Sequence, residues 1–214
     1  NLLEKGNMYN KVEIENQLVP EKDENGNWYF TTDGDFKVMH LTDIHIGGGF
    51  MSKSVDEKAL NAVATMVTKE NPDLVIATGD ITFPVPYRAG TFNNYSGIKS
   101  FANLMESLGV YWDVTFGNHD SEAYTYFDRE DVAALYGSGE FEHCLFQAGP
   151  KDVDGYGNHT IAVKNSKNTN GGGRTLNDRR QQGAHQHAQN RISEHRQKLG
   201  KLRHVGQGLH CGGH

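Results

Sequence analysis

The fold is set by the stretch FKVMHLTDIH, residues 36–45, in which a short apolar strand runs directly into polar side chains. Residues 36–41 predict a β-strand, and residues 55–70 carry apolar side chains at the spacing of an α-helix. Residues 74–77 predict a second strand, apolar without interruption, as is typical of a strand buried on both faces. The unit is therefore strand, helix, strand.

A second unit of the same kind follows along the chain. Residues 98–108 predict a helix with one apolar face, and residues 110–116 predict a third strand. Successive units of this kind place their strands in one parallel sheet, because the crossover connections are right-handed. Parallel strands bring their carboxyl ends to one edge, where ligands of open α/β sheets bind.

Polar side chains stand at all three of these strand ends. They are Asp43 and His45 after the first strand, Asp80 after the second, and Asn118, His119 and Asp120 after the third. The steps from residue 43 to 80 and from 80 to 118 are 37 and 38 residues, and each matches one crossover unit. Gly79 and Gly117 precede two of the groups and allow a sharp turn of the backbone.

The alternative to metal binding is a purely structural role for each of these residues, in a turn or a helix cap. This is the usual role of a single aspartate after a strand. Three strand ends that carry ligand-type residues at crossover spacing would be an unusual coincidence. Oxygen and imidazole ligands suit Mn, Fe or Zn. The sequence therefore predicts a metal site at this edge of the sheet.

The three blocks Asp-x-His, Gly-Asp and Gly-Asn-His-Asp resemble the first three blocks of the calcineurin-like metallophosphoesterases, in their purple acid phosphatase-like bacterial branch. The resemblance covers only the N-terminal half of that fold. It implies an α/β sandwich of mixed sheets flanked by helices, here incomplete. The implied reaction is hydrolysis of a phosphate ester by water that two divalent or trivalent metal ions activate.

The resemblance also implies a role for each matching residue. Asp43 and His45 would hold the first metal, Asp80 would bridge both metals, and Asn118 would bind the second. The first block has His45 where the iron-binding purple acid phosphatases have a second aspartate, so their coloured ferric site is not implied.

Substrate binding and catalysis fall on the third block. The resemblance implies that Asn118 and His119 bind the substrate, and that His119 contacts the phosphate or protonates the leaving oxygen. Asp120 is a second catalytic candidate, on the hypothesis that its side chain meets His119 and changes the proton affinity of the ring.

Composition divides the chain at residue 170. Residues 1–170 hold 13 Lys+Arg and 25 Asp+Glu, whereas residues 171–214 hold eight Lys+Arg, two acids, six His and no aromatic residue. We interpret residues 1–35 as a lead-in of strand and turns, residues 36–170 as the N-terminal half of a phosphoesterase domain, and residues 171–214 as a basic, disordered tail. The family's second-half histidine blocks do not follow Val163 in recognisable form.

Three interpretations of this tail compete. It is a basic arm that binds nucleic acid or anionic surfaces nonspecifically, or a divergent second half in which His185 and His187 are ligands, or the product of a shifted reading frame, which we favour. Without second-half ligands, the rival to an enzyme is a noncatalytic remnant or a module that binds a metal or an anion.

Apolar runs in the sequence are too short for a membrane span, so none is expected, and the expected partner is a phosphate-ester substrate. The chain begins at Asn1 rather than Met, which indicates an incomplete N-terminus that a signal peptide could have preceded. The compartment is therefore open, with the cytoplasm favoured.

The shifted-frame interpretation predicts a specific nucleotide sequence. Across codons 160–214 and beyond, another frame should encode apolar strands and a Gly-His-x-His block. Sequencing the DNA of this region is the measurement, and an alternative frame without such strands would contradict the idea.

Overall fold

The computed structural model describes residue 9 and residues 16–167 and 174–176. Its elements are β1 (Glu21–Lys22), β2 (Trp28–Thr31), β3 (Val38–Leu41), α2 (Lys53–Glu70), β4 (Leu74–Thr78), α3 (Pro86–Ala89), α4 (Tyr95–Leu108), β5 (Trp112–Thr115), α5 (Arg129–Tyr136), β6 (Ile161–Lys164) and β7 (Arg174–Leu176). The predicted boundary at residue 170 and nearly all of the basic tail lie outside the described residues.

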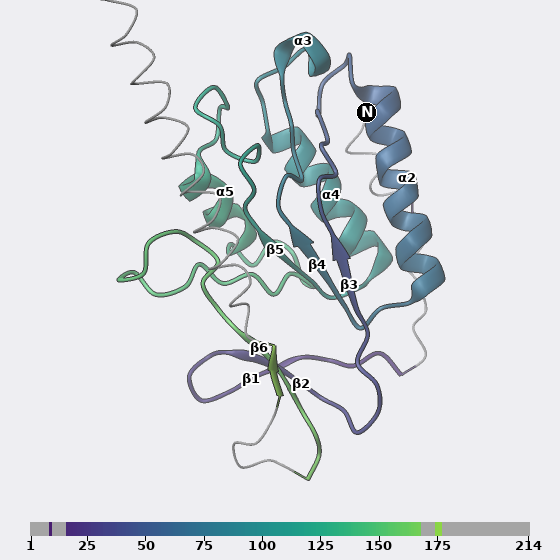
Figure 1. Ribbon diagram of the computed structural model, residues 1–214, viewed down its shortest axis with the longest axis vertical. Helices are drawn as coiled ribbons and strands as arrows, with labels where there is room; N and C mark the ends of the chain where they lie inside the picture. The colour runs from purple at the N-terminus through teal and green to yellow at the C-terminus, as the bar shows by residue number, and fades with distance from the viewer. Residues whose placement is uncertain (1–8, 10–15, 168–173, 177–214) are drawn as a thin grey trace, which may run out of the picture. The chain divides into compact units, whose positions relative to one another are not determined.

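The predicted parallel sheet is present, with strand order β3-β4-β5. In its register, Val38 pairs with Leu74, and Val75 pairs with Trp112. Two right-handed crossovers in one direction place both connecting helices on the same face, and α2 and α4 contact each other there (Figure 1). All three carboxyl ends therefore point to the edge of the sheet near α3.

A second sheet has the strand order β1-β2-β6-β7. Strands β2 and β6 are parallel, and the other two pairs are antiparallel. A small apolar cluster that includes Phe30 of β2, Leu74 of β4 and Ile161 of β6 links the second sheet to the first. Two sheets, one parallel and one mixed, with flanking helices confirm the predicted α/β class.

The main core lies between the parallel sheet and its helices. Helix α4 buries Phe101, Leu104, Met105 and Leu108, the apolar face that its sequence predicts. All four residues of β5 are buried, and the Trp112 ring packs edge-on against Phe101. This core fixes β5 and therefore the position of the loop that follows it.

Ser54 and Glu57 have the spacing of a capping box and predict Ser54 as the N-cap of α2, but the structure differs. The helix begins at Lys53 with Ser52 at the cap position. Buried Asp56 accepts hydrogen bonds from the Ser52 hydroxyl and from the backbone N–H groups of Gly47 and Gly48. The capping interaction therefore also anchors the glycine loop, residues 47–49, that follows the first polar block.

Residues 140–146 form no strand, and an isolated bridge joins Cys144 to Trp112. Asp128 caps α5, because its carboxylate accepts from Asp131 N–H and the Asp131 carboxylate accepts from Asp128 N–H. No helix among the described residues is long and apolar enough to cross a membrane.

The same substitution at two positions of α2 tests the assignment of its buried face. Val63 is 3% exposed and Val55 is 65% exposed. Val63→Ala should lower the free energy of unfolding by about 2 kcal/mol, because buried methyl groups are lost and a cavity remains. Val55→Ala should change it by less than about 0.5 kcal/mol. Urea unfolding measures both, and equal effects would contradict this orientation of the helix.

Candidate metal centre

Beyond their last paired residues, β3 and β4 continue side by side as irregular backbone. Asp43 N–H donates to the Gly79 carbonyl at 3.2 Å, and His45 N–H donates to the Asp80 carbonyl at 3.0 Å. Ile46 and Thr82 then form an isolated parallel bridge. These bonds bring the first two polar blocks together at one edge of the sheet.

Three of the predicted metal ligands have left-handed backbone conformations. The φ angles of Asp43, His45 and Asp80 are 55°, 55° and 51°. This region is uncommon for residues other than glycine, and such strain concentrates at functional sites. The left-handed backbone turns the chain at each residue, and the surrounding hydrogen bonds hold it there.

The two glycines predicted to permit sharp turns face each other across β4 and β5. A Cβ on Gly79, at φ 102°, would lie 2.8 Å from the Gly117 Cα. A Cβ on Gly117 would lie 2.0 Å from Asp80 Oδ1. Because the backbones approach this closely, the second and third polar blocks meet.

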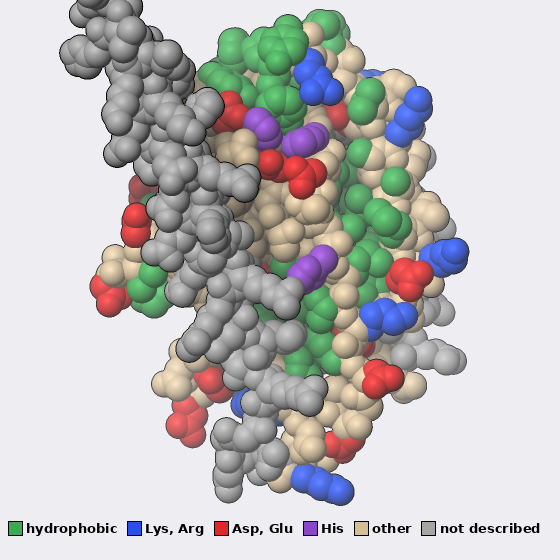
Figure 2. Space-filling model, in the orientation of Figure 1, with side chains coloured by type: hydrophobic (Ala, Val, Ile, Leu, Met, Phe, Trp, Pro, Cys, Tyr) green, Lys and Arg blue, Asp and Glu red, His purple; other side chains and the backbone are tan. Residues whose placement is uncertain are grey.

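The side chains of the first two blocks converge. His45 Nε2 lies 3.8 Å from Asp43 Oδ1 and 3.8 Å from Asp80 Oδ2. Potential ligand atoms of His45, Asp80 and His119 all lie within 4.8 Å of one another. Figure 2 shows histidine and acidic side chains gathered here beside a hydrophobic patch. The Asp80 side chain is 13% exposed, while the Asp43 and His45 side chains are more open.

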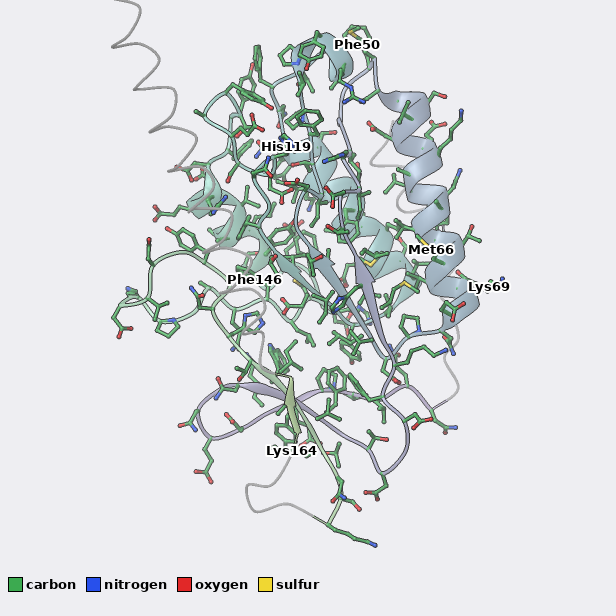
Figure 3. All side chains as sticks on the ribbon, in the orientation of Figure 1. Phe50, Met66, Lys69, His119, Phe146 and Lys164 are labelled. Atoms are coloured by element: carbon green, nitrogen blue, oxygen red, sulfur yellow. The ribbon has the colours of Figure 1, made fainter. Side chains whose placement is uncertain are left out.

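His119 is fixed from three sides (Figure 3). Its N–H donates to Asp80 Oδ1 at 2.8 Å. Its ring lies 4.1 Å from the Phe83 ring and 5.5 Å from the His45 ring, centroid to centroid. Its Nδ1 contacts the Glu122 carboxylate. The third polar block therefore reaches the same site.

Asn118, the predicted ligand of the second metal, is exposed in the loop between Gly117 and His119. It follows the end of β5, and its role as a metal ligand stays a prediction. His143 and His159, two histidines without a predicted role, are engaged elsewhere: His143 Nδ1 is 2.9 Å from Glu106, and buried His159 is 2.9 Å from Asp113.

Asp120 has a different place from the one hypothesised. Its carboxylate, on a residue 3% exposed, accepts hydrogen bonds from the N–H groups of Asp80, Thr82 and Gly117 at 2.8–2.9 Å. Burial raises the pKa of Asp120, and these backbone donors oppose the rise. The described bonds of Asp120 hold the backbone of the site, and the acid that contacts the His119 ring is Glu122 instead.

Sequence reasoning missed Glu122, Phe83 and Asp56. Glu122 follows His119 by three residues, a spacing that could have suggested contact across a turn. Burial of the Tyr124 hydroxyl and its neighbour Glu122 raise the pKa of Tyr124 to about 12. Phe83 lay in the predicted loop 81–94, where no pattern in the sequence distinguishes its ring from other aromatic residues.

The donor set fits a hard or borderline metal cation. Carboxylate oxygens come from Asp43 and Asp80 and an imidazole nitrogen comes from His45, and the His119 ring lies beside them. Asp80 keeps one oxygen for the backbone of His119 and turns the other toward His45. A bound cation would offset the charge of the two clustered carboxylates.

The model of the calcineurin-like phosphoesterase family matches residues 36–207. The chain belongs to the calcineurin-like phosphoesterase family. The match begins two residues before β3 and includes every residue of the three polar blocks. It also extends through most of the segment from residue 171, whose interpretation as frame-shifted stays a prediction.

Two curated proteins to which the chain is similar are called purple acid phosphatases. "Probable inactive purple acid phosphatase 14" from Arabidopsis thaliana is 26% identical over 151 residues, which cover 63% of this chain and 36% of that protein. "Probable inactive purple acid phosphatase 29" from the same plant is 27% identical over 153 residues, with the same coverage.

"Phosphatase DCR2" from Saccharomyces cerevisiae is 26% identical over 155 residues, covering 65% of this chain and 25% of that protein. The chain thus spans 25–36% of the length of these relatives. No solved structure matches it.

A methyl group added at Gly117 should damage the site selectively. Gly117→Ala places its Cβ against Asp80, so we expect a loss of about 1–3 kcal/mol of stability and weaker Mn²⁺ binding. Gly34→Ala is the control, since the nearest atom to its Cβ is 3.8 Å away. Thermal unfolding and calorimetric titration measure the two effects. Unchanged stability and Mn²⁺ affinity in Gly117→Ala would contradict the close approach of the strand ends.

Proposed function

We propose that this chain is a metal-dependent phosphoesterase, which hydrolyses a phosphate ester with water activated by a dinuclear metal site. The observation that carries the proposal is the gathering of Asp43, His45, Asp80 and His119 at one strand edge. Family membership supports the reaction class, because residues 36–207 match the phosphoesterase model.

The proposed cations are two ions of Mn, Fe or Zn. Asp43 and His45 would hold the first, Asp80 would bridge, and the Asn118 amide oxygen would hold the second. Such a pair supplies a hydroxide near neutral pH and neutralises charge on the phosphate. Asp80 is suited to the bridging position because Oδ2 faces His45 while its other oxygen is fixed by His119 N–H.

His119 and Asn118 are the proposed substrate-binding residues. The His119 ring stands beside the ligand cluster and can hydrogen-bond a phosphate oxygen or give a proton to the leaving oxygen. Phe83 packs against this ring and limits the access of water from one side. Asp120 enters the proposal only through the backbone that it holds.

A noncatalytic remnant, or a module that binds a metal or an anion, is the second candidate. It is favoured by the names of the two plant relatives, both of which are called probable inactive. It is also favoured by the sequence after Val163, where Gly183, His185 and His187 form a poor substitute for the family's last histidine block. These three residues lie outside the described part of the chain.

Metal binding and hydrolysis separate the two candidates. The enzyme should hydrolyse an aryl phosphate when Mn²⁺ is added, and Asp80→Asn should lower Mn²⁺ affinity by at least about tenfold, as even outer-sphere substitutions do. Exposed Asp152→Asn is the matched control. Mn²⁺ binding without hydrolysis would favour the noncatalytic module, and loss of activity in His187→Ala would assign ligands to the tail.

A further inference from the structure

The contact between Glu122 and His119 has no role in the proposal so far. It joins a carboxylate oxygen to Nδ1 of the ring, between side chains that are 28% and 27% exposed. The two residues are three apart, in the loop between β5 and α5. An ion pair with side chains this open to solvent contributes little to stability, so we consider its effect on the protonation of the ring.

An ionised carboxylate only accepts hydrogen bonds, so Nδ1 must carry the proton in this contact. The neutral ring is then the Nδ1–H tautomer, and Nε2 holds the lone pair. In water a neutral histidine exchanges between its two tautomers, and a hydrogen bond at one nitrogen decides which nitrogen carries the proton. Glu122 therefore fixes the proton of the neutral ring on Nδ1 and leaves the lone pair on Nε2.

Other contacts restrict the position of the His119 ring beside Glu122. The Phe83 ring, 4.1 Å from the His119 ring, restricts its rotation. The His119 backbone is fixed to Asp80 Oδ1. Tyr124 adjoins Glu122, and burial followed by this neighbour raises the pKa of its hydroxyl to about 12.

We propose that Glu122 is a positioning residue that holds His119 in the Nδ1–H tautomer and so presents Nε2 to the phosphate or to the leaving oxygen. The tautomer stands on geometry alone, whereas its catalytic consequence rests on the proposed function. In that reaction water forms the new P–O bond and gives up a proton to solvent, while the ester P–O bond breaks and its electron pair goes to the leaving oxygen. The leaving oxygen takes a proton from Nε2 of the ring, which carries a proton on both nitrogens before the step and is left as the Nδ1–H tautomer that Glu122 stabilises.

The tautomer can be measured without any activity. The full chain is labelled with ¹⁵N and kept metal-free with EDTA, at a basic pH where a histidine ring is neutral. The His119 ring nitrogens are assigned from the signals that vanish in His119→Gln. We expect the protonated nitrogen to be Nδ1. A neutral ring with its proton on Nε2 in the wild-type chain would overturn the inference, and this test needs no Glu122 variant.

Substitution of Glu122 then tests the cause. Glu122→Ala should shift the tautomer ratio toward Nε2–H by about tenfold or more, as expected from the loss of a hydrogen bond to a charged group. Glu122→Asp should restore part of the Nδ1–H population, and exposed Glu142→Ala should leave the ratio unchanged. An unchanged ratio in a folded Glu122→Ala variant would overturn the inference.

Kinetics distinguish this inference from the proposed function. With Mn²⁺ and an aryl phosphate, Glu122→Ala should lower kcat by about tenfold or more, which is less than the roughly 100- to 10,000-fold contribution of general acid–base catalysis, because His119 itself remains. KM should change by less than about twofold. A chain without hydrolysis, but with Glu122-dependent Nδ1–H, would overturn the proposed function and leave the positioning role supported. An active chain whose kcat is unaffected in Glu122→Ala would overturn the catalytic consequence of that role.

Discussion

The site depends on one buried carboxylate, that of Asp120, which is not a proposed metal ligand. Asp120 accepts hydrogen bonds from the N–H groups of Asp80 and Thr82 beyond β4, and from Gly117 beyond β5. A loop directly after a strand has no ladder partner for its backbone donors, and a buried donor without a partner costs about 1–3 kcal/mol. The carboxylate satisfies three of them at once and ties two strand ends to one point.

Asp80 takes part both in the hydrogen bonds that hold the strand ends and in the cluster of proposed metal ligands. One of its oxygens accepts from His119 N–H, and the other faces His45 Nε2. The residue therefore links the end of β4 to the end of β5 and still presents an oxygen to a cation. The approach of Gly79 to Gly117 makes this link possible, because any larger residue at position 117 would occupy the space of the carboxylate.

The parallel sheet and the edge at which the polar blocks meet could be predicted, because both follow from the spacing of apolar residues along the chain. Apolar runs and helical faces recur at crossover spacing, and topology alone then brings Asp43, Asp80 and His119 together. This spacing does not determine the direction of a side chain within an irregular turn. Asp120 and Glu122 both follow His119 closely, yet Asp120 points into the protein and Glu122 meets the ring. Only the fold of the turn decides between the two.

The left-handed backbone at Asp43, His45 and Asp80 limits what substitution could gain at these positions. Glycine enters this region at the lowest cost, because it has no Cβ. At position 80, however, glycine would remove the oxygen that accepts the His119 N–H. Relief of backbone strain there would therefore loosen the connection between the ends of β4 and β5.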